Sequence, residues 1–295
     1  MKLRIRLNAY RHFSPSKSTF SPSAKPSAVI LKPKSQMKSN LLTILSILFF
    51  QLSFGQNTEE LNNQSKELIQ QGKFNEAFPI LKKAAELGNS EAQYNLGYFL
   101  QSGTTGIKDV KAAIEWYKKS SDNGFNNGHY AMMMAYGNGE GVEQNSEKAF
   151  EYALKCADND DATCMWNVVN CYLTGNGVKV DISKFKEWIV RLAKLQNPEN
   201  LALSGNITSA RLEIANFYKK GEHFEQDNYT SYLWYLIYNE SKVDLSILKQ
   251  EEVITEIKEI ETKLSKQQIK NAPIDAEKIF GQKLNNINEL YKSSL

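Results

Sequence analysis

Apolar positions in the middle of the chain recur with the period of an α-helix. Over residues 162–174 they fall at i, i+3, i+4 and i+7 and share one helical face: Met165, Val168, Val169 and Tyr172. The glycine-containing segment 175–177 then predicts a helix end, because glycine takes the left-handed conformation found there. A second amphipathic stretch follows residue 180, with Asp181 and Ser183 as N-cap candidates. The pattern therefore predicts two helices joined by a glycine-rich loop.

This pair of helices repeats every 36 residues. An aromatic residue of the second helix returns at Trp116, Tyr152 and Trp188, and Trp234 follows after an insertion of ten residues around 196–205. A fixed period of about 20–50 residues is typical of arrays in which each unit buries its apolar face against its neighbours. The sequence therefore predicts an all-α solenoid. The helices expected elsewhere in the array cover residues 65–71, 75–87, 130–136, 150–154, 210–218 and 229–238.

The residues after the last repeat form helices of a different kind. Apolar residues at i, i+4, i+7 and i+11 predict one apolar stripe on a charged helix: Val253, Ile257, Ile260 and Leu264. Ser265 and Gln268 form a capping-box pattern that starts a further helix. A final helix is expected from the apolar residues Ile279, Leu284, Ile287 and Leu290. We expect residues 243–295 to cap a monomeric array, because four apolar positions are too few for a coiled-coil dimer.

The first 55 residues are expected to lie outside the fold. Residues 37–55 combine a short basic start, an apolar run and small residues before Gln56, which is the pattern of a secretory signal peptide. An uncleaved anchor is the alternative, although the apolar run is shorter than the roughly 20 residues of a membrane span. Residues 1–36 are a leader of doubtful status, either because translation begins at Met37 or because they are a transit peptide. Residues 56–64 are then a linker.

These segments place the mature protein outside the cytoplasm, in the periplasm of a bacterium or secreted, without stable insertion in a membrane. They also change the charge balance. The nine basic residues of 1–55 have no acidic counterpart, and removing them leaves 27 Lys and Arg against 33 Asp and Glu, a net charge of −6. The basic character of the whole chain therefore comes from the leader, and nucleic acid is not an expected partner.

Several segments resemble the Sel1-like repeat, a relative of the tetratricopeptide repeat. They are residues 92–97 (AQYNLG), 113–119 (AIEWYKK) and 139–142 (GEGV). The resemblance has departures, since Met133 and Val169 stand where the family usually has glycine. It implies a right-handed α-solenoid of helix pairs over residues 65–242. It also implies a non-enzymatic scaffold for protein–protein interaction, whose partner is a protein or a peptide.

In tetratricopeptide-type solenoids the first helix of each pair lines the concave face. By motif position, that face carries Tyr94, Tyr98, Tyr130, Met134, Trp166 and Asn170. Aromatic and methionine side chains suit an extended peptide or a helix, because they bury much area and adapt to its shape. The competing interpretation is that the aromatic residues at the 36-residue spacing pack between neighbouring units.

Three cysteines follow the leader: Cys156, Cys164 and Cys171. The spacing of the first two is similar to that of the cysteine-rich branch of Sel1 proteins, in which such a pair bridges adjacent helices. The resemblance therefore implies a disulfide between Cys156 and Cys164, and an exported protein meets the oxidising conditions that it needs. The alternative is that all three are small buried apolar residues. No metal ion is expected, because a four-ligand set is not present nearby.

No catalytic residue and no cofactor are expected. The histidines after the leader are His129 and His223, and His223 is interpreted as a solvated residue beside a loop. Residues 158–161 (DNDD) lack the glycine and distal glutamate of a calcium loop, and are interpreted as a turn between helices. The cysteine-rich Sel1 branch is associated with penicillin binding and weak β-lactam hydrolysis. The alternative function is therefore a cell-wall (muropeptide or penicillin) binding protein or a weak β-lactamase-like hydrolase.

Overall fold

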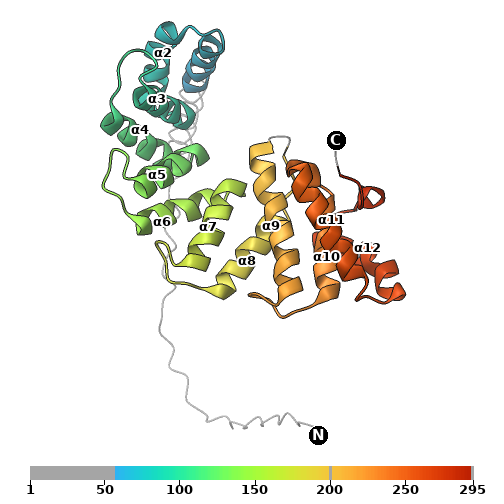
Figure 1. Ribbon diagram of the computed structural model, residues 1–295. Helices are drawn as coiled ribbons and strands as arrows, with labels where there is room; N and C mark the ends of the chain where they lie inside the picture. The colour runs from blue at the N-terminus through green and yellow to red at the C-terminus, as the bar shows by residue number, and fades with distance from the viewer. Residues whose placement is uncertain (1–56, 199–200, 294–295) are drawn as a thin grey trace, which may run out of the picture. The chain divides into compact units, whose positions relative to one another are not determined.

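The computed structural model describes residues 57–198 and 201–293, and these residues form helices and loops without strands. From residue 74 to residue 261 each α-helix packs against the next, so that the chain builds a series of helix pairs (Figure 1). The predicted helical solenoid is thereby confirmed. A first helix covers residues 57–70, and it is followed by α2 (Phe74–Glu86), α3 (Ser90–Ser102), α4 (Val110–Asp122), α5 (Asn126–Asn138), α6 (Ser146–Ala157), α7 (Ala162–Thr174), α8 (Ile182–Ala193), α9 (Leu201–Lys220) and α10 (Asn228–Asn239).

The second helix of each pair begins in the same way. An Asp or Asn side chain at the N-cap accepts a hydrogen bond from a backbone N–H of the first turn, as capping residues commonly do. These residues are Asp109 before α4, Asn145 before α6, Asp181 before α8 and Asp227 before α10. Of the two candidates before α8, the cap is therefore Asp181, whose carboxylate lies 2.9 Å from the N–H of Lys184. Ser183 lies inside the helix.

The aromatic residue that returns every 36 positions carries a basic side chain over its ring. The ammonium or guanidinium three residues later lies 4.0, 4.9 and 4.8 Å from the ring centroids of Trp116, Tyr152 and Trp188. The three basic residues are Lys119, Lys155 and Arg191. The repeated position therefore combines an apolar packing group with a cation–π contact at the edge of the core.

The loops inside successive pairs press against the preceding unit. A Cβ atom added at Gly141 would stand 2.7 Å from the side chain of Ile114 in α4. One added at Gly177 would stand 2.6 Å from the carbonyl carbon of Ser146, the first residue of α6, and closer still to its oxygen. Both glycines have a positive φ. In the next loop this place is taken by His223, which also has a positive φ of 60°. The two glycines thus allow their loops to approach the preceding unit closely.

The ten-residue insertion lengthens a helix. The sequence predicted a helix over 210–218, whereas α9 begins at Leu201. The extension is helical because its apolar positions continue the buried face, with Ile207, Ala210 and Ile214 each 1 % exposed or less. The predicted helix over 210–218 is therefore only the second half of α9.

A buried polar cluster occupies the space beside this extension. Arg211 is 1 % exposed, and its guanidinium donates to the carbonyls of Ala193 (2.9 Å) and Leu195 (2.8 Å) at the end of α8. It also donates to the hydroxyl of Ser241 at 2.7 Å. Asp244 accepts from Asn197, Ser204 and Thr208. Burial lowers the pKa of Arg211 to about 10, although the nearby Asp244 opposes this shift. The cluster ties α8, α9 and the segment after α10 together.

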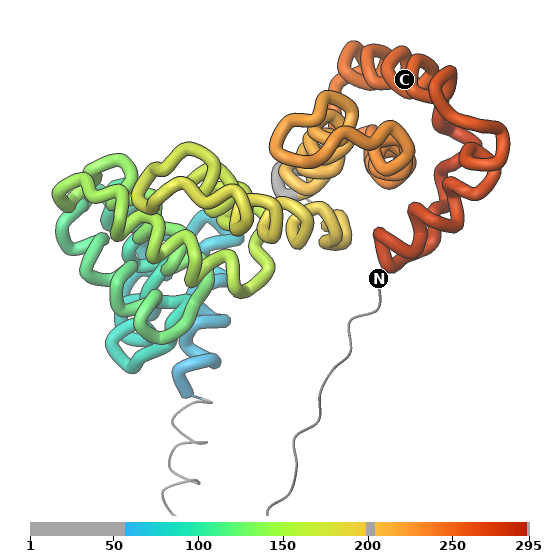
Figure 2. The backbone as a smooth tube through the Cα atoms, turned by 90° about the horizontal axis from the view of Figure 1, so that it is seen from below, coloured from blue at the N-terminus to red at the C-terminus, as the bar shows by residue number. Residues whose placement is uncertain are grey.

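The C-terminal helices pack against α10. After a short 3-10 turn (η1, Lys242–Asp244) come α11 (Ile247–Glu261) and α12 (Lys266–Phe280), which curve around α9 and α10 (Figure 2). The capping box of Ser265 with Gln268 is present as predicted. Three tyrosines of α10 donate to carboxylates of the two helices: Tyr229 to Asp275, Tyr232 to Glu261 and Tyr235 to Glu256. These bonds fix the C-terminal helices on the end of the array.

Two expectations about the ends of this region were wrong. The segment 57–64, expected as part of a linker, is helical, because Asn62 and Ser65 are fully buried and Leu61 packs against the core. The final helix expected from residue 279 onward does not form. Gly281 ends α12 with a φ of 78°, and the residues after it, up to 293, contain only a 3-10 turn (η2, Ile287–Glu289). Leu284 and Leu290 are nevertheless buried.

Within residues 57–198 and 201–293, no helix has both the length and the apolar character needed to cross a bilayer. The leader, the signal peptide over 37–55 and the first residue of the linker lie outside the described residues.

Candidate interaction surface on the first helices

The first helices of three successive pairs carry a set of equivalent positions, here called the first-helix face. Its positions lie at i, i+3, i+4, i+7 and i+11 of each helix, repeat every 36 residues, and are all exposed or half-buried. They are Glu91, Tyr94, Asn95, Tyr98 and Ser102 on α3; Asn127, Tyr130, Ala131, Met134 and Asn138 on α5; and Thr163, Trp166, Asn167, Asn170 and Thr174 on α7. All six binding residues expected from the sequence belong to this face.

Those six residues form two rows. Tyr94, Tyr130 and Trp166 are half-buried and touch the core, whereas the residues one turn later are exposed. In the exposed row, Tyr98 is 54 % and Met134 is 41 % exposed, and Asn170 completes it. Large apolar side chains with that exposure are available to a partner without rearrangement of the core.

Tyr94 is largely a packing residue. Its ring centroid lies 5.6 Å from that of Tyr117 and 5.8 Å from that of Phe125, so it fills space between α3, α4 and the following turn. Burial raises the pKa of Tyr94, and the nearby phenols of Tyr98 and Tyr130 raise it further. At this position the competing interpretation, packing between units, therefore accounts for much of the ring.

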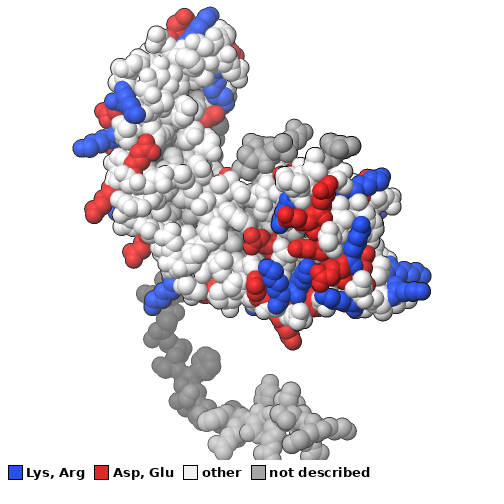
Figure 3. All heavy atoms as spheres, in the orientation of Figure 1, with Lys and Arg blue, Asp and Glu red and all other residues white. Residues whose placement is uncertain are grey.

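The three helices of the first-helix face carry almost no charge. Within their bounds α3 has one charged residue and α5 and α7 have none, whereas α4 has five and α6 and α8 have four each. The single charge, Glu91, lies 3.1 Å from the ammonium of Lys66 and accepts a hydrogen bond from Asn62 at 2.6 Å. On the side seen in Figure 3, uncharged residues cover much of α3–α7, while charged side chains gather over the C-terminal helices. Apart from Glu91, the first-helix face thus carries no charged side chain.

Asparagine amides supply the polar groups of the face. Asn167 donates to the carbonyl of Thr163 at 2.8 Å, and Asn170 donates to that of Trp166 at 3.0 Å. Each of these bonds uses one N–H of the amide and orients the side chain along its helix. A primary amide has a second N–H and a carbonyl oxygen, so both residues keep a donor and an acceptor for a ligand.

A hollow of about 510 Å³ adjoins the N-terminal end of the face. The sequence did not predict this hollow. One of its walls is the helix over residues 57–70, part of which was expected to be a linker. Its lining residues are Lys66, Ile69 and Gln70 of the first helix, Phe74 of α2, Glu91, Asn95, Tyr98 and Phe99 of α3, and Thr104. Three of them, Glu91, Asn95 and Tyr98, also belong to the first-helix face.

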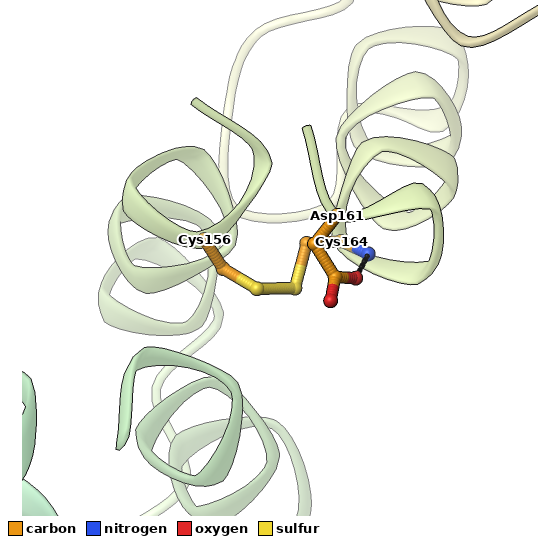
Figure 4. Close-up of side chains that lie close together, drawn as sticks. All are labelled: Cys156, Asp161 and Cys164. Atoms are coloured by element: carbon orange, nitrogen blue, oxygen red, sulfur yellow. Dashed lines mark hydrogen bonds between the residues drawn. A yellow bond between two sulfur atoms is a disulfide. The ribbon is translucent and has the colours of Figure 1, made fainter. Parts of the chain in front are cut away.

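The predicted disulfide between Cys156 and Cys164 is present and joins α6 to α7 (Figure 4). Both residues are fully buried, and their Cα atoms are 5.7 Å apart. Asp161 lies beside them and accepts a hydrogen bond from the backbone N–H of Cys164 at 2.9 Å, which caps α7. These three side chains are close enough to suit a metal ion, but the sulfurs are bonded to each other and are not thiolates. Cys171 is half-buried, and burial raises its pKa.

Both histidines of the described region have packing roles. His129 is 8 % exposed, and its Nδ1 lies 2.7 Å from the hydroxyl of Ser121. Burial lowers the pKa of His129, and nearby Lys155 lowers it further. His223 is exposed, as expected, yet its ring centroid lies 5.2 Å from that of Phe185 and 5.1 Å from that of Phe217. Neither histidine lies on the first-helix face.

The acidic segment 158–161 forms the turn between α6 and α7. The guanidinium of Arg191 on α8 lies 3.7 Å from a carboxylate oxygen of Asp158 and 2.7 Å from one of Asp160. Asp160 takes a positive φ of 57°. These contacts give the acidic side chains structural partners in the neighbouring unit.

Comparison with known proteins places these helices among repeat proteins. The Sel1 repeat family matches residues 73–89, 90–125, 129–161 and 163–196. The fold is similar to the crystal structure of a Sel1 repeat protein from Oxalobacter formigenes, with a TM-score of 0.54 and 24 % sequence identity over 66 % of this chain and 76 % of that chain. At that identity the likeness concerns the fold.

A second similar structure is a protective antigen present in uropathogenic Escherichia coli strains that displays an SLR fold. The match has 23 % sequence identity, covers 74 % of this chain and 50 % of that chain, and has a TM-score of 0.38. A TM-score that low does not establish a common arrangement of the whole chain.

Proposed function

The chain is a Sel1-repeat protein with four matched repeats between residues 73 and 196, and from this premise we propose that it is an exported, non-enzymatic scaffold that binds a protein or peptide segment on its first-helix face. Sel1-repeat proteins generally act as scaffolds for protein interaction. For this chain the proposal adds the face and the location.

The observation that carries the proposal is a pair of exposed apolar side chains on an almost uncharged surface. Tyr98 and Met134 are 54 % and 41 % exposed, one repeat apart, and the half-buried Tyr130 and Trp166 lie beside the exposed row. Aromatic anchors surrounded by weaker contacts are typical of binding hot spots. Because the first helix of each pair lines the concave side in tetratricopeptide-type arrays, we place the partner on that side.

Export is supported by the disulfide together with the sequence of the N-terminus. Disulfides persist in oxidising compartments and are rare in the cytosol, and Cys156 and Cys164 are bonded. The pattern of a signal peptide over 37–55 belongs to residues that the structure does not describe, so it supports the proposal from the sequence alone. The proposed location is the bacterial periplasm or the exterior of the cell.

Capture from envelope extracts tests the proposal with two matched variants. Tyr98→Ala/Met134→Ala removes the two exposed apolar groups of the face. Ile107→Ala/Val180→Ala removes two residues of similar exposure, 55 % and 56 %, from loops outside it. We expect the wild type and the loop variant to retain the same protein, and the face variant to lose it, with all three folded by circular dichroism.

Retention of that protein by the face variant would contradict the proposal. So would turnover of a cell-wall substrate or a β-lactam that is abolished by one polar substitution, since a scaffold consumes nothing.

A further inference from the structure

We propose that the bound segment is an uncharged stretch of peptide, and that it places one apolar side chain in the hollow between the helix over residues 57–70 and α3. This inference rests on the proposed function, because the hollow adjoins the first-helix face. It adds the chemistry of the partner and an anchoring site.

The hollow has an aromatic floor and walls from two helices. Phe74 is 38 % exposed, and its ring meets that of Phe99 edge-on, with 6.0 Å between centroids. Ile69 of the first helix and Tyr98 of α3 also line the hollow. Its volume of about 510 Å³ lies within the range of about 300–1,000 Å³ of ligand pockets, which are mostly apolar. The hollow is large enough for a leucine or aromatic side chain of a peptide, and its aromatic lining suits an apolar group.

Both charged groups of the hollow are already paired. Lys66 and Glu91 form an ion pair at 3.1 Å, and Asn62 donates to the same carboxylate oxygen of Glu91. A charged ligand group would have to compete with this pair. An apolar group leaves it intact, which favours an apolar occupant.

The rest of the face offers a charged ligand no counter-charge. Of its fifteen positions only Glu91 is charged, and α5 and α7 contain no Asp, Glu, Lys or Arg. Moving a charged group out of water without giving it a new partner costs free energy. The face therefore selects against either sign of charge, and binding to it depends little on salt, because salt screens charge–charge interactions.

The polar groups of the face match the backbone of a peptide. Asn167 and Asn170 each keep an amide N–H and a carbonyl oxygen after bonding to their own helix. Those are the partners that a peptide backbone requires, with one N–H and one C=O in each residue. Met134, exposed at the centre of the face, packs readily against varied apolar side chains.

The probe for this inference is a set of synthetic peptides of about twelve residues, selected from a random displayed library on the full chain. Binding is measured by fluorescence anisotropy from about 0.05 M to about 0.5 M NaCl. Gln70→Trp blocks the hollow from its rim, where Gln70 is exposed. Gln267→Trp is the control, because Gln267 is an exposed residue of α12. Met134→Lys and Met134→Glu place either charge at the centre of the face.

The selected peptides are expected to be uncharged in the stretch that binds, with affinities that change less than about twofold over the salt range. Both Met134 substitutions should weaken binding by about tenfold or more, whichever charge they introduce. Gln70→Trp should weaken it similarly and Gln267→Trp should not. Replacing the anchoring apolar residue of the peptide by alanine should weaken binding to the wild type and have little further effect on Gln70→Trp.

Two results would overturn the inference and leave the proposed function standing. One is binding that needs Tyr98 and Met134 but is unaffected by Gln70→Trp. The other is a selected peptide whose affinity rises with one of the two charges at Met134. If no peptide depends on the first-helix face, or if a neutral oligosaccharide binds there instead, the proposed function fails together with the inference.

Discussion

Replacing Gly177 by alanine should loosen the contact between the third and second repeats. Gly177 lies in the loop between α7 and α8 with a φ of 75°. The new methyl group would overlap the backbone carbonyl of Ser146 and stand 3.1 Å from the Cβ atom of Phe150. Ser146 begins α6, so the carbonyl cannot move unless the first turn of that helix moves with it.

Two costs add at this position. An alanine in the left-handed conformation costs about 1–2 kcal/mol, and inserting a methyl group into a filled space costs about 1–3 kcal/mol more. The expected loss in the free energy of unfolding is therefore about 2–5 kcal/mol. Gly106→Ala separates the two costs, because Gly106 has a φ of 84° and nothing lies within 4 Å of its added Cβ atom. Gly106→Ala should therefore lose only the stability that corresponds to the left-handed conformation.

Urea unfolding followed by circular dichroism and tryptophan fluorescence measures both variants. A repeat array can unfold in parts, so the slope with urea is compared as well as the midpoint. We expect Gly177→Ala to be less stable than Gly106→Ala by about 1–3 kcal/mol. Equal stability of the two variants would show that the close approach of the loop to α6 contributes nothing, and would refute the reasoning.

Three further perturbations have distinct expected outcomes. Cys156→Ser/Cys164→Ser should lose about 2–3 kcal/mol of stability, from the entropy of closing a loop with a sequence separation of 8, and reduction of the wild type should shift the urea midpoint equally. Arg211→Met should lose about 2–5 kcal/mol in thermal or urea unfolding, because it leaves one buried and one part-buried carbonyl at the end of α8 without this donor; an unchanged midpoint would contradict this. The pKa of His129 is lowered in the folded chain, so its contribution to stability is present above its ordinary value of about 6.5 and is lost as the pH falls below it. A plot of melting temperature against pH should accordingly be flatter for His129→Gln, and an identical slope would exclude a role for this group.

The 36-residue spacing of apolar and capping residues predicted the repeated part of the fold in detail. α7 covers the predicted residues 162–174, and Asp181 caps α8, because local periodicity and cap chemistry determine both features. The start of the first helix, over residues 57–64, and the start of α9 were missed for the opposite reason. Their buried positions include Asn62 and Ser204, polar residues that the pattern of apolar positions does not detect.

The candidate site was predictable only in part. The spacing located all six face residues, but it could not separate packing from exposure at Tyr94, which depends on Tyr117 and Phe125 from other elements. The lack of charge on α5 and α7 can be read from the sequence once the helices are paired. The hollow could not be foreseen, since it forms where the first helix meets α3 and α2.

The disulfide between α6 and α7 also affects how the protein withstands proteases. It spans the turn at residues 158–160, which is exposed. Exposed turns are the preferred places for a protease to cut. A cut there would break the backbone while Cys156 and Cys164 still hold the two fragments together, with α6 and α7 packed as before. A nicked chain should therefore migrate as one species on a non-reducing gel and as two after reduction, and in an environment rich in proteases the array could lose a peptide bond and keep its binding face.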